Sequence, residues 1–243
     1  MAHRYLDESL VAAEIGAVVE LTGDEARHAV QVSRVRAGER LEIGNGRGLV
    51  VEGPVLSAEP GSLRLEVEAL REEPAPAPAL WLVQALAKGD RDELAAQTAT
   101  ELGAAGVVPW AAARSVVRWE GAKREKALAR WRTIVREAAK QSLRAHLPEV
   151  APLAKLADLV RLAGEHRVVL LDPRAETPID RLDLEGVDRV YLVVGPEGGI
   201  APEEVAALLA AGAVHARLGG NVLRASTAGP AAIAALSGPL GRW

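Results

Sequence analysis

Two glycine-bearing segments near the end of the chain have the composition of ligand-binding loops. The first, Gly195-Pro196-Glu197-Gly198-Gly199, directly follows the short apolar run 191–194. The second, 218–223, contains Gly219 and Gly220 and also follows a short apolar run. Glycines let a ligand approach the backbone closely and leave amides and carbonyls free to contact a nucleobase or a ribose. One such loop would most simply be a tight turn, but two of them favour a nucleotide-like ligand.

A third segment of this kind, Asp172-Pro173, follows the apolar run 167–171. None of the three segments has the lysine of a phosphate-binding P-loop or the spacing of a dinucleotide fingerprint, which weakens the case for a nucleotide-dependent α/β enzyme. The chain contains no Cys, which excludes disulfides, thiol nucleophiles and thiolate metal sites. The sequence therefore predicts a cofactor site built from loop backbone.

The second half of the chain alternates between strand and helix patterns. Strands are expected at 80–85, 107–110, 167–171 and 191–194, and helices at 91–102, 121–143, 202–211 and from about 226. This alternation predicts a parallel sheet with helices on its faces. In such sheets a ligand sits beyond the carboxyl ends of the strands, which is where the glycine-bearing segments fall.

The first 70 residues have a different pattern, with several short strands and one helix. Leu63, Leu65 and Val67 alternate with charged residues, as in a half-buried strand, and Asn45-Gly46 favours a hairpin turn. We therefore expect a small β-barrel over 1–70. The Pro/Ala-rich stretch 71–79 reads as an extended linker to a second domain, 80–243.

Basic residues gather in one part of the chain. Between Arg114 and Arg144 there are ten basic and three acidic residues, a net charge of +7 in a chain whose net charge is −4. Arg132, Arg136, Lys140 and Arg144 are spaced four apart, which places them on one ridge of the expected helix. A solvated surface is the simplest explanation, but a ridge that is nearly all basic favours contact with nucleic-acid phosphates.

No apolar run approaches the ~20 residues that a membrane span requires, and the N-terminus lacks the apolar region of a signal peptide. A cytoplasmic protein is expected.

Five segments, in order along nearly the whole chain, resemble the bacterial 16S ribosomal RNA uridine-N3 methyltransferases of the SPOUT class. They are RHAVQVSRVRAGERLEIGNGRG (27–48), KGDRDELAAQTATELG (88–103), EAAKQSLRAHLPEV (137–150), LVVGPEGG (192–199) and LGGNVLRASTA (218–228). The chain departs from the family at Asn221, where a basic residue is usual, and at Ser226, where an acidic one is usual. These departures put side-chain roles at both positions in doubt and leave the glycines, Leu223 and Arg224 in place.

The resemblance implies an α/β SPOUT domain with a C-terminal deep trefoil knot, a rare exception to unknotted topology. It also implies a PUA-like barrel for RNA, S-adenosylmethionine (SAM) as cofactor, a homodimer, and 16S rRNA in the small ribosomal subunit as substrate, with no metal. The implied cofactor contacts are Leu170, Leu171, Asp172, Pro173, Val194, Gly195, Pro196, Glu197, Gly198, Gly199, Leu218, Gly219, Gly220, Asn221, Val222 and Leu223.

RNA contacts are expected from the barrel, from the basic ridge, and from two positions that the family segments suggest for the target uridine, Arg114 and Gln141. The full set is Arg4, Arg27, Arg34, Arg114, Arg132, Arg136, Lys140, Gln141 and Arg144.

Two residues are candidates for catalysis. Loss of the uridine N3 proton leaves negative charge on O2 and O4, which Arg224 could stabilise electrostatically. Glu197 is the candidate proton acceptor or base-edge anchor. Equally, Arg224 could start a helix or form a salt bridge, and Glu197 could cap the helix that follows. Alternative functions are methylation of another RNA, such as tRNA or 23S rRNA, and RNA binding without catalysis.

Overall fold

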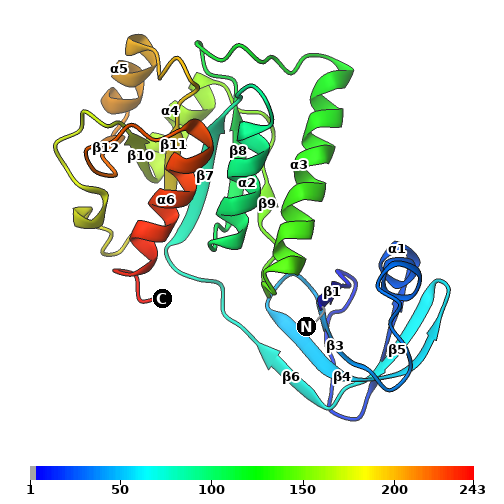
Figure 1. Cartoon of the computed structure of the whole chain (residues 1–243). Helices are drawn as coiled ribbons and strands as arrows, with labels where there is room; N and C mark the ends of the chain where they lie inside the picture. Colours follow the sequence, from blue (N-terminus) through cyan, green and yellow to red (C-terminus); the bar gives the residue numbers. More distant parts are fainter. Residues whose placement is uncertain (1–3) are drawn as a thin grey trace. The chain divides into compact units, whose positions relative to one another are not determined.

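The structure is a computed structural model that describes residues 4–243 (Figure 1). It divides into two compact units. The first comprises the chain up to residue 75 together with 139–147, and the second comprises 76–138 and 148–243. The expected linker 71–79 thus contributes to both units, and no sequence pattern predicts that 139–147 packs with the first.

The first unit is a six-stranded sheet with one helical segment. Strands β1 (Arg4–Leu6), β3 (Arg40–Gly44), β4 (Leu49–Glu59), β5 (Ser62–Glu66) and β2 (Val18–Thr22) lie in that order, and β6 (Ala69–Glu72) also pairs with β4. The pairings are antiparallel except for β1 with β3. The first half of β4 pairs with β3 and β6 and its second half with β5, so the sheet wraps around a shared strand in the manner of a small barrel.

The core of this unit is formed by the alternating residues of its strands. Leu63 and Leu65 of β5 and Leu21 of β2 are buried, whereas Arg64 between the two leucines is exposed. Helix α1 (Gly23–Arg27) continues into a π-helix, η1 (His28–Val32), and covers the core with Ala26 and Ala29. The alternation predicted for 63–67 is confirmed.

The hairpin between β3 and β4 is longer than the two-residue turn that Asn45-Gly46 favours. The Asn45 amide donates to the Leu49 carbonyl at 3.0 Å, and the Asn45 side-chain oxygen accepts the Arg47 and Leu49 amides at 2.7 and 3.1 Å. Gly46 and Gly48 both have positive φ, at +70° and +110°. The asparagine therefore organises a loop through its side chain, which the dipeptide pattern alone does not reveal.

The second unit is a parallel sheet in the order β12-β10-β11-β7-β8-β9. Every pairing in it is parallel. The strands are β7 (Ala79–Ala85), β8 (Gly106–Trp110), β9 (Glu149–Val150), β10 (Arg167–Leu171), β11 (Arg189–Val194) and β12 (Val214–Ala216). The helices are α2 (Arg91–Glu101), α3 (Ala122–Gln141), α4 (Leu156–Glu165), η2 (Ile179–Arg181, a 3₁₀ turn), α5 (Pro202–Ala210) and α6 (Ala225–Ser237).

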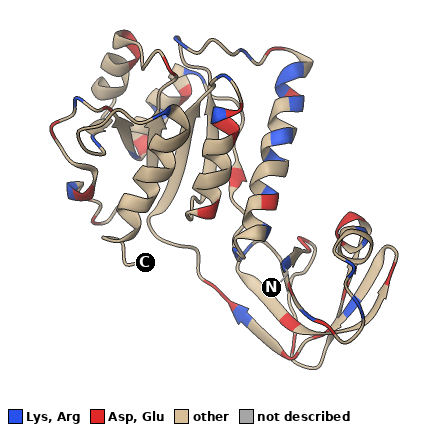
Figure 2. Cartoon of the chain, in the orientation of Figure 1, with Lys and Arg blue, Asp and Glu red and all other residues tan. Residues whose placement is uncertain are grey.

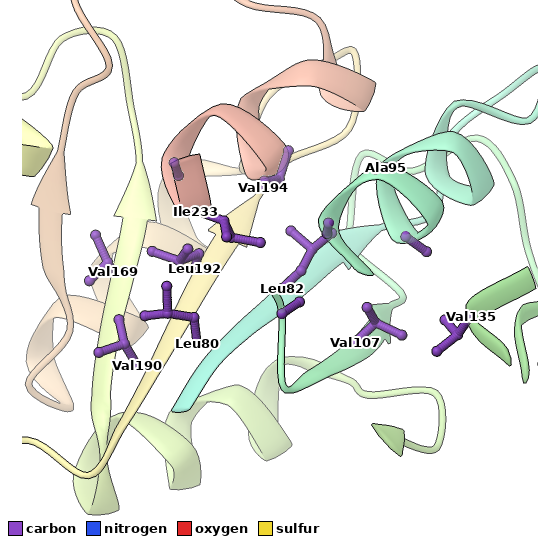
Figure 3. Close-up of a cluster of buried hydrophobic side chains, with 14 of the residues drawn as sticks. Leu80, Leu82, Ala95, Val107, Val135, Val169, Val190, Leu192, Val194 and Ile233 are labelled. Carbon is purple, nitrogen blue, oxygen red and sulfur yellow. The ribbon is translucent and has the colours of Figure 1, made fainter. Parts of the chain in front are cut away.

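Apolar clusters cover both faces of this sheet. Leu80 and Leu82 of β7 point into the cluster formed with α2, α3 and α6 (Figure 3), whereas Trp81 and Val83 point into the cluster formed with α4 and α5. Strands buried on both faces are expected to be continuously apolar, as 80–83 is. The predicted parallel sheet with helices on both faces is confirmed.

The C-terminal segment is closely engaged with the connection between β10 and β11. The Arg217 amide donates to the Thr177 carbonyl at 2.9 Å, and the Ile179 amide donates to the Arg217 carbonyl at 3.0 Å. The Arg217 guanidinium also donates to the Ala175 carbonyl at 3.0 Å. This is the part of the chain in which the resemblance places the knot.

Candidate cofactor site

A cavity of about 550 Å³ lies at the carboxyl ends of β10, β11 and β12. Strands β11 and β12 flank β10 on opposite sides, so the loops after all three strands meet there. Volumes of about 300–1,000 Å³ are usual for pockets that enclose small molecules. The position agrees with the rule that open parallel sheets bind ligands beyond their carboxyl ends.

The predicted cofactor residues line this cavity, with two exceptions. Gly219 and Gly220 are not part of its wall. Gly219 has a φ of +113°, a left-handed conformation that favours glycine in the turn after β12. Those that line it are Leu170, Leu171, Asp172, Pro173, Val194, Gly195, Pro196, Glu197, Gly198, Gly199, Leu218, Asn221, Val222 and Leu223.

Close packing against Ile200 requires glycine at position 195, the first residue of the loop 195–199. A Cβ at Gly195 would lie 2.8 Å from Ile200 Cγ1 and 3.1 Å from the Ile200 amide nitrogen. The turn is closed by the Gly199 amide, which donates to the Pro196 carbonyl at 2.8 Å, and Gly199 has a φ of +71°. Only glycine allows this close return of the chain at the cavity wall.

Glu197 is held by the loop that follows β7. Its Oε1 accepts the Lys88 amide at 3.2 Å and the Arg91 guanidinium at 2.8 Å. Partial burial raises the pKa of this carboxyl, but the backbone amides of Glu197 and Lys88 and the Arg91 side chain outweigh that effect and hold it below its usual range. A carboxylate with a lowered pKa is a weaker base, so the geometry favours a holding role over proton transfer.

Arg224 lies at the cavity wall as the N-cap residue of α6, and its side chain is exposed. Its carbonyl accepts the Thr227 and Ala228 amides at 2.9 and 3.0 Å, which begins the helix. Within residues 4–243 the guanidinium makes no hydrogen bond or ion pair. Its charge is therefore available to a ligand.

Arg114, which the sequence predicts only as an RNA contact, also belongs to the cavity wall. Its guanidinium donates to the Gly198 carbonyl at 3.1 Å. The buried Glu204 anchors the same stretch, because its carboxylate accepts the Ala113 amide at 2.8 Å and the Ala201 amide at 3.2 Å. The loop after β8 is thus fastened to the loop after β11 at two points.

At the end of β10, Asp172 is paired with Arg174. The carboxylate accepts the Arg174 amide at 2.9 Å and its guanidinium at 3.0 and 2.9 Å. The Arg174 side chain holds the pKa of Asp172 below its usual range. The carboxylate therefore remains charged and shapes the loop.

Two of the predicted RNA-binding side chains are withdrawn, because they are buried in the first unit. The Arg4 side chain is 2% exposed and donates to Glu42 at 2.8 Å and to the Leu143 carbonyl. The Lys140 side chain is 8% exposed and lies 3.1 Å from Glu25. The carboxylate partner of each side chain compensates for the free-energy cost of removing its charge from water.

The remaining predicted RNA contacts vary in exposure. Arg27 is exposed and paired with Asp24, whereas the side chains of Arg34 and Arg132 are exposed and make no hydrogen bond or ion pair within residues 4–243. Arg136 and Arg144 are half-buried, and Gln141 is exposed at the end of α3. Arg132 is thus the most exposed member of the basic ridge, and Figure 2 shows further Lys and Arg along α3.

Several cavity residues were missed by the sequence analysis. Arg91 and Arg174 follow strand ends that had been recognised, so the same positional rule could have found them. Ile200, Val205 and His215 carry no pattern of their own and reach the cavity only through the fold. The full set not predicted for the cofactor is Arg91, Arg114, Arg174, Ile200, Val205, His215, Ala216, Arg224, Ala225 and Ala228.

Two kinds of feature are not found in the part of the chain that the structure describes. Every helix between residues 4 and 243 is too short or too polar to cross a membrane. The same residues contain no group of three or more His, Asp or Glu side chains placed to hold a metal ion.

Known proteins share both parts of this architecture. The RNA methyltransferase domain family matches residues 73–237, and the RNA methyltransferase PUA domain family matches residues 21–68. The ribosomal RNA small subunit methyltransferase E of Mycobacterium bovis is 43% identical over 235 residues, 95% of this chain and 90% of that protein. The Bacillus subtilis protein of the same name is 29% identical over 226 residues, 89% of this chain and 88% of its own.

A solved structure is similar over the whole chain. The crystal structure of a ribosomal RNA small subunit methyltransferase E from Neisseria gonorrhoeae, bound to S-adenosyl methionine, has a TM-score of 0.87 and 26% sequence identity, and covers 98% of both chains. A PUA-like unit joined to a parallel sheet with a loop-lined cavity defines an RNA methyltransferase of the SPOUT class. The chain belongs to the ribosomal RNA small subunit methyltransferase E family. The predicted family and fold class are confirmed.

Proposed function

We propose that the protein is a SAM-dependent methyltransferase that methylates N3 of a specific uridine in the 16S rRNA of the small ribosomal subunit, in the cytoplasm. The observation that carries the proposal is the cavity at the three strand ends, with the unpaired Arg224 at its wall, in a chain of this family.

The cavity has the features that SAM requires. Leu171, Leu218 and Leu223 provide apolar surface for an adenine ring, and Gly195 brings backbone close to the ligand. Both acidic groups in the wall, Asp172 and Glu197, are already paired with arginines. When bound, SAM supplies a methyl group on a positively charged sulfur, which a nucleophilic nitrogen can attack.

Arg224 has the chemistry that the target base needs. The N3 nitrogen becomes nucleophilic as it loses its proton to solvent, and the negative charge spreads to O2 and O4. The methyl group then passes from sulfur to N3, and S-adenosylhomocysteine is the other product. A guanidinium held at the helix start lowers the energy of that charge without first giving up an internal partner. The proton-acceptor role predicted for Glu197 is not part of this proposal, because its Oε1 is engaged and its pKa is lowered.

RNA contact is assigned to the exposed basic side chains. Lys123, Lys126 and Arg132 of α3 are exposed and make no ion pair within residues 4–243, and Arg34 is exposed in the first unit. Such charges bind phosphates without reading sequence. The PUA family match to residues 21–68 supports an RNA-binding role for the first unit.

We also propose a homodimer. Val222 lies in the cavity-lining loop after β12 and is 82% exposed, which suits burial against a second copy. Light scattering on the purified chain tests this point, and a single mass equal to one chain would contradict it.

Mass-spectrometric mapping of methyl groups, with isotope-labelled SAM, tests the function. The two substrates are 30S subunits from cells lacking this enzyme and naked 16S rRNA. We expect one labelled uridine, modified at N3, in the 30S subunits, and the naked 16S rRNA is compared with them. Label on tRNA or 23S rRNA with unmodified 16S rRNA would overturn the substrate assignment. SAM binding absent at high micromolar concentration would instead indicate an RNA-binding protein without catalysis.

A further inference from the structure

The segment 88–93, KGDRDE, follows β7 at the sheet edge that carries the cavity, and the proposed function gives it no role. Two successive residues in it are left-handed, Gly89 with a φ of +64° and Asp90 with a φ of +57°. This conformation is unfavourable for Asp90 and persists only where neighbouring contacts hold it. Strained backbone of this kind is typical of functional segments.

The contacts that hold the segment come first from its own helix. The Asp92 side chain is buried, and its carboxylate accepts the Ala87 amide at 3.2 Å and the Glu93 amide at 2.9 Å. Glu93 in turn accepts the Arg130 guanidinium of α3 at 2.6 Å. The turn before α2 is therefore fixed from the inside, and its outward-facing groups have defined positions.

Those outward-facing groups converge on a single carboxylate oxygen. The Lys88 amide and the Arg91 guanidinium both donate to Glu197 Oε1, at 3.2 and 2.8 Å. Glu197 is followed by Gly198 and Gly199, which impose little conformation of their own. On the other side of the loop, Arg114 holds the Gly198 carbonyl at 3.1 Å. The glycine loop of the cavity is thus held from two neighbouring loops.

We propose that Arg91 is a positioning residue that acts through Glu197 to hold the loop 195–199 over the bound cofactor, so that this bridge sets how long SAM is retained. The inference rests on the proposed function. Both partners line the cavity, which places the bridge beside the ligand. The lowered pKa of Glu197 keeps its carboxylate charged at neutral pH and the bridge intact.

Titration calorimetry and stopped-flow displacement of SAM test this role in Arg91→Ala, Arg91→Lys and Glu197→Gln. The two side chains are 40% and 34% exposed, so the bridge is only partly shielded from solvent. We therefore expect Arg91→Ala and Glu197→Gln to raise the Kd for SAM by about three- to tenfold, mainly through faster dissociation. Turnover at saturating SAM should fall by a smaller factor than the Kd rises, and Arg91→Lys restores part of the affinity because it keeps the charge.

A double variant and a matched control isolate the bridge. Arg91→Ala with Glu197→Gln is expected to bind SAM no more weakly than the weaker single variant, because both substitutions remove a charge from the same ion pair. Arg161→Ala breaks an exposed ion pair of the same type in α4, with Glu165, and leaves the Kd unchanged. The thermal midpoint of each variant separates loop positioning from general destabilisation.

Three outcomes would overturn the inference alone. They are an unchanged Kd in Arg91→Ala, effects that add in the double variant, and a Glu197→Gln protein that binds SAM normally but has lost turnover. Failure of the unmodified protein to bind SAM would overturn the proposed function itself, and the two failures are therefore distinguishable.

Discussion

At the scale of single residues, the arginines of the cavity wall differ in whether their side chains already have a partner in the protein. Arg91 and Arg174 are paired with Glu197 and Asp172, and Arg114 holds a carbonyl, whereas Arg224 makes no such contact within residues 4–243. A group that must respond to charge developing in a transition state is most effective when no internal partner competes for it. Arg224 is therefore the residue whose loss should affect turnover most.

We predict that Arg224→Ala lowers turnover about a hundredfold, which is the effect of removing one donor to a developing anion. The Kd for SAM should change by less than about threefold, because the side chain is at the wall and the helix start depends on the backbone carbonyl. Single-turnover methylation of 30S subunits measures the first quantity and calorimetry the second. Unchanged turnover with normal SAM and RNA binding would remove Arg224 from the mechanism.

Residue types alone could predict where chemistry lies but not how each charge is used. The glycine segments and their strand-end positions predicted the three loops of the cavity wall, but ten other wall residues were not predicted for the cofactor. Glu197 and Arg91 are distant in sequence, however, and no local pattern announces their contact. Lys140 shows that a local pattern can also predict a contact that the fold does not allow. Its four-residue spacing placed it on the basic ridge, but spacing does not reveal that this turn of α3 packs beside Glu25.

At the scale of elements, the loop after β11 depends on a close approach of the backbone. We predict that Gly195→Ala raises the Kd for SAM about tenfold or more, because the added Cβ would lie 2.8 Å from Ile200 Cγ1 and the loop must move. Gly164→Ala is the matched control. Gly164 lies in α4 with open space around it, so alanine there should preserve SAM binding and slightly stabilise the helix. Equal affinity in both variants would contradict the packing argument.

The strands of the first unit contain a carboxylate whose ionisation stabilises the fold. Glu42 of β3 accepts Arg4 at 2.8 Å, and Arg71 of β6 lies 2.8 Å from its other oxygen. Burial raises the pKa of Glu42, but the two arginines outweigh burial and leave the pKa below its usual range. A lowered pKa in the folded state means that the stabilisation is complete above the unfolded pKa. It is lost as the pH falls through the folded pKa.

We therefore expect Glu42→Gln to reduce the free energy of unfolding at pH 7 by about 2–3 kcal/mol, because the buried Arg4 loses its charged partner. The difference between the two proteins should narrow as the pH falls below about 4.3, where an exposed glutamate takes up its proton. Urea unfolding followed by circular dichroism at pH 7, 5, 4 and 3 measures it. A difference that stays constant over this range would mean that the Glu42 charge does not stabilise the barrel.

The helices and strands with a clear hydrophobic pattern could be predicted from the sequence, whereas the shortest strands could not. Strand β7 is apolar on both faces, and the α3 periodicity extends over five turns, so both were expected close to their observed bounds. Strands β1 and β9 have only three and two residues, which is too few for any alternation to show. Their pairing is set by the neighbouring strand, so tertiary contacts decide it.

At the scale of the whole molecule, the charge distribution decides how an acidic chain binds RNA. The net charge is −4, yet α3 presents exposed bases on several of its turns (Figure 2). Lys123, Lys126 and Arg132 have no ion pair within residues 4–243, whereas Arg130 is neutralised by Glu93. From this pattern we propose that the three unpaired bases contact RNA phosphates, which would be independent of the methyl-transfer chemistry.

The salt dependence of RNA binding measures that contact directly. Each neutralised phosphate releases counterions, so the slope of log K against log[salt] is about −0.7 per contact for single-stranded RNA and about −0.9 for a duplex. We predict that replacing Lys123, Lys126 and Arg132 together by alanine makes the slope shallower by about two, with weaker binding at every salt concentration. SAM affinity should not change, because none of the three lines the cavity.

A control with the same loss of charge removes the effect of net charge from this experiment. The control uses three exposed bases outside α3, which are Lys155 at the N-cap of α4, Arg161 in α4 and Arg181 in η2. Replacing these three by alanine changes the total charge equally but should leave the slope near that of the unmodified protein. If both triple variants reduced the slope by the same amount, the RNA would be responding to net charge. Only a difference between them would support a phosphate-binding face on α3.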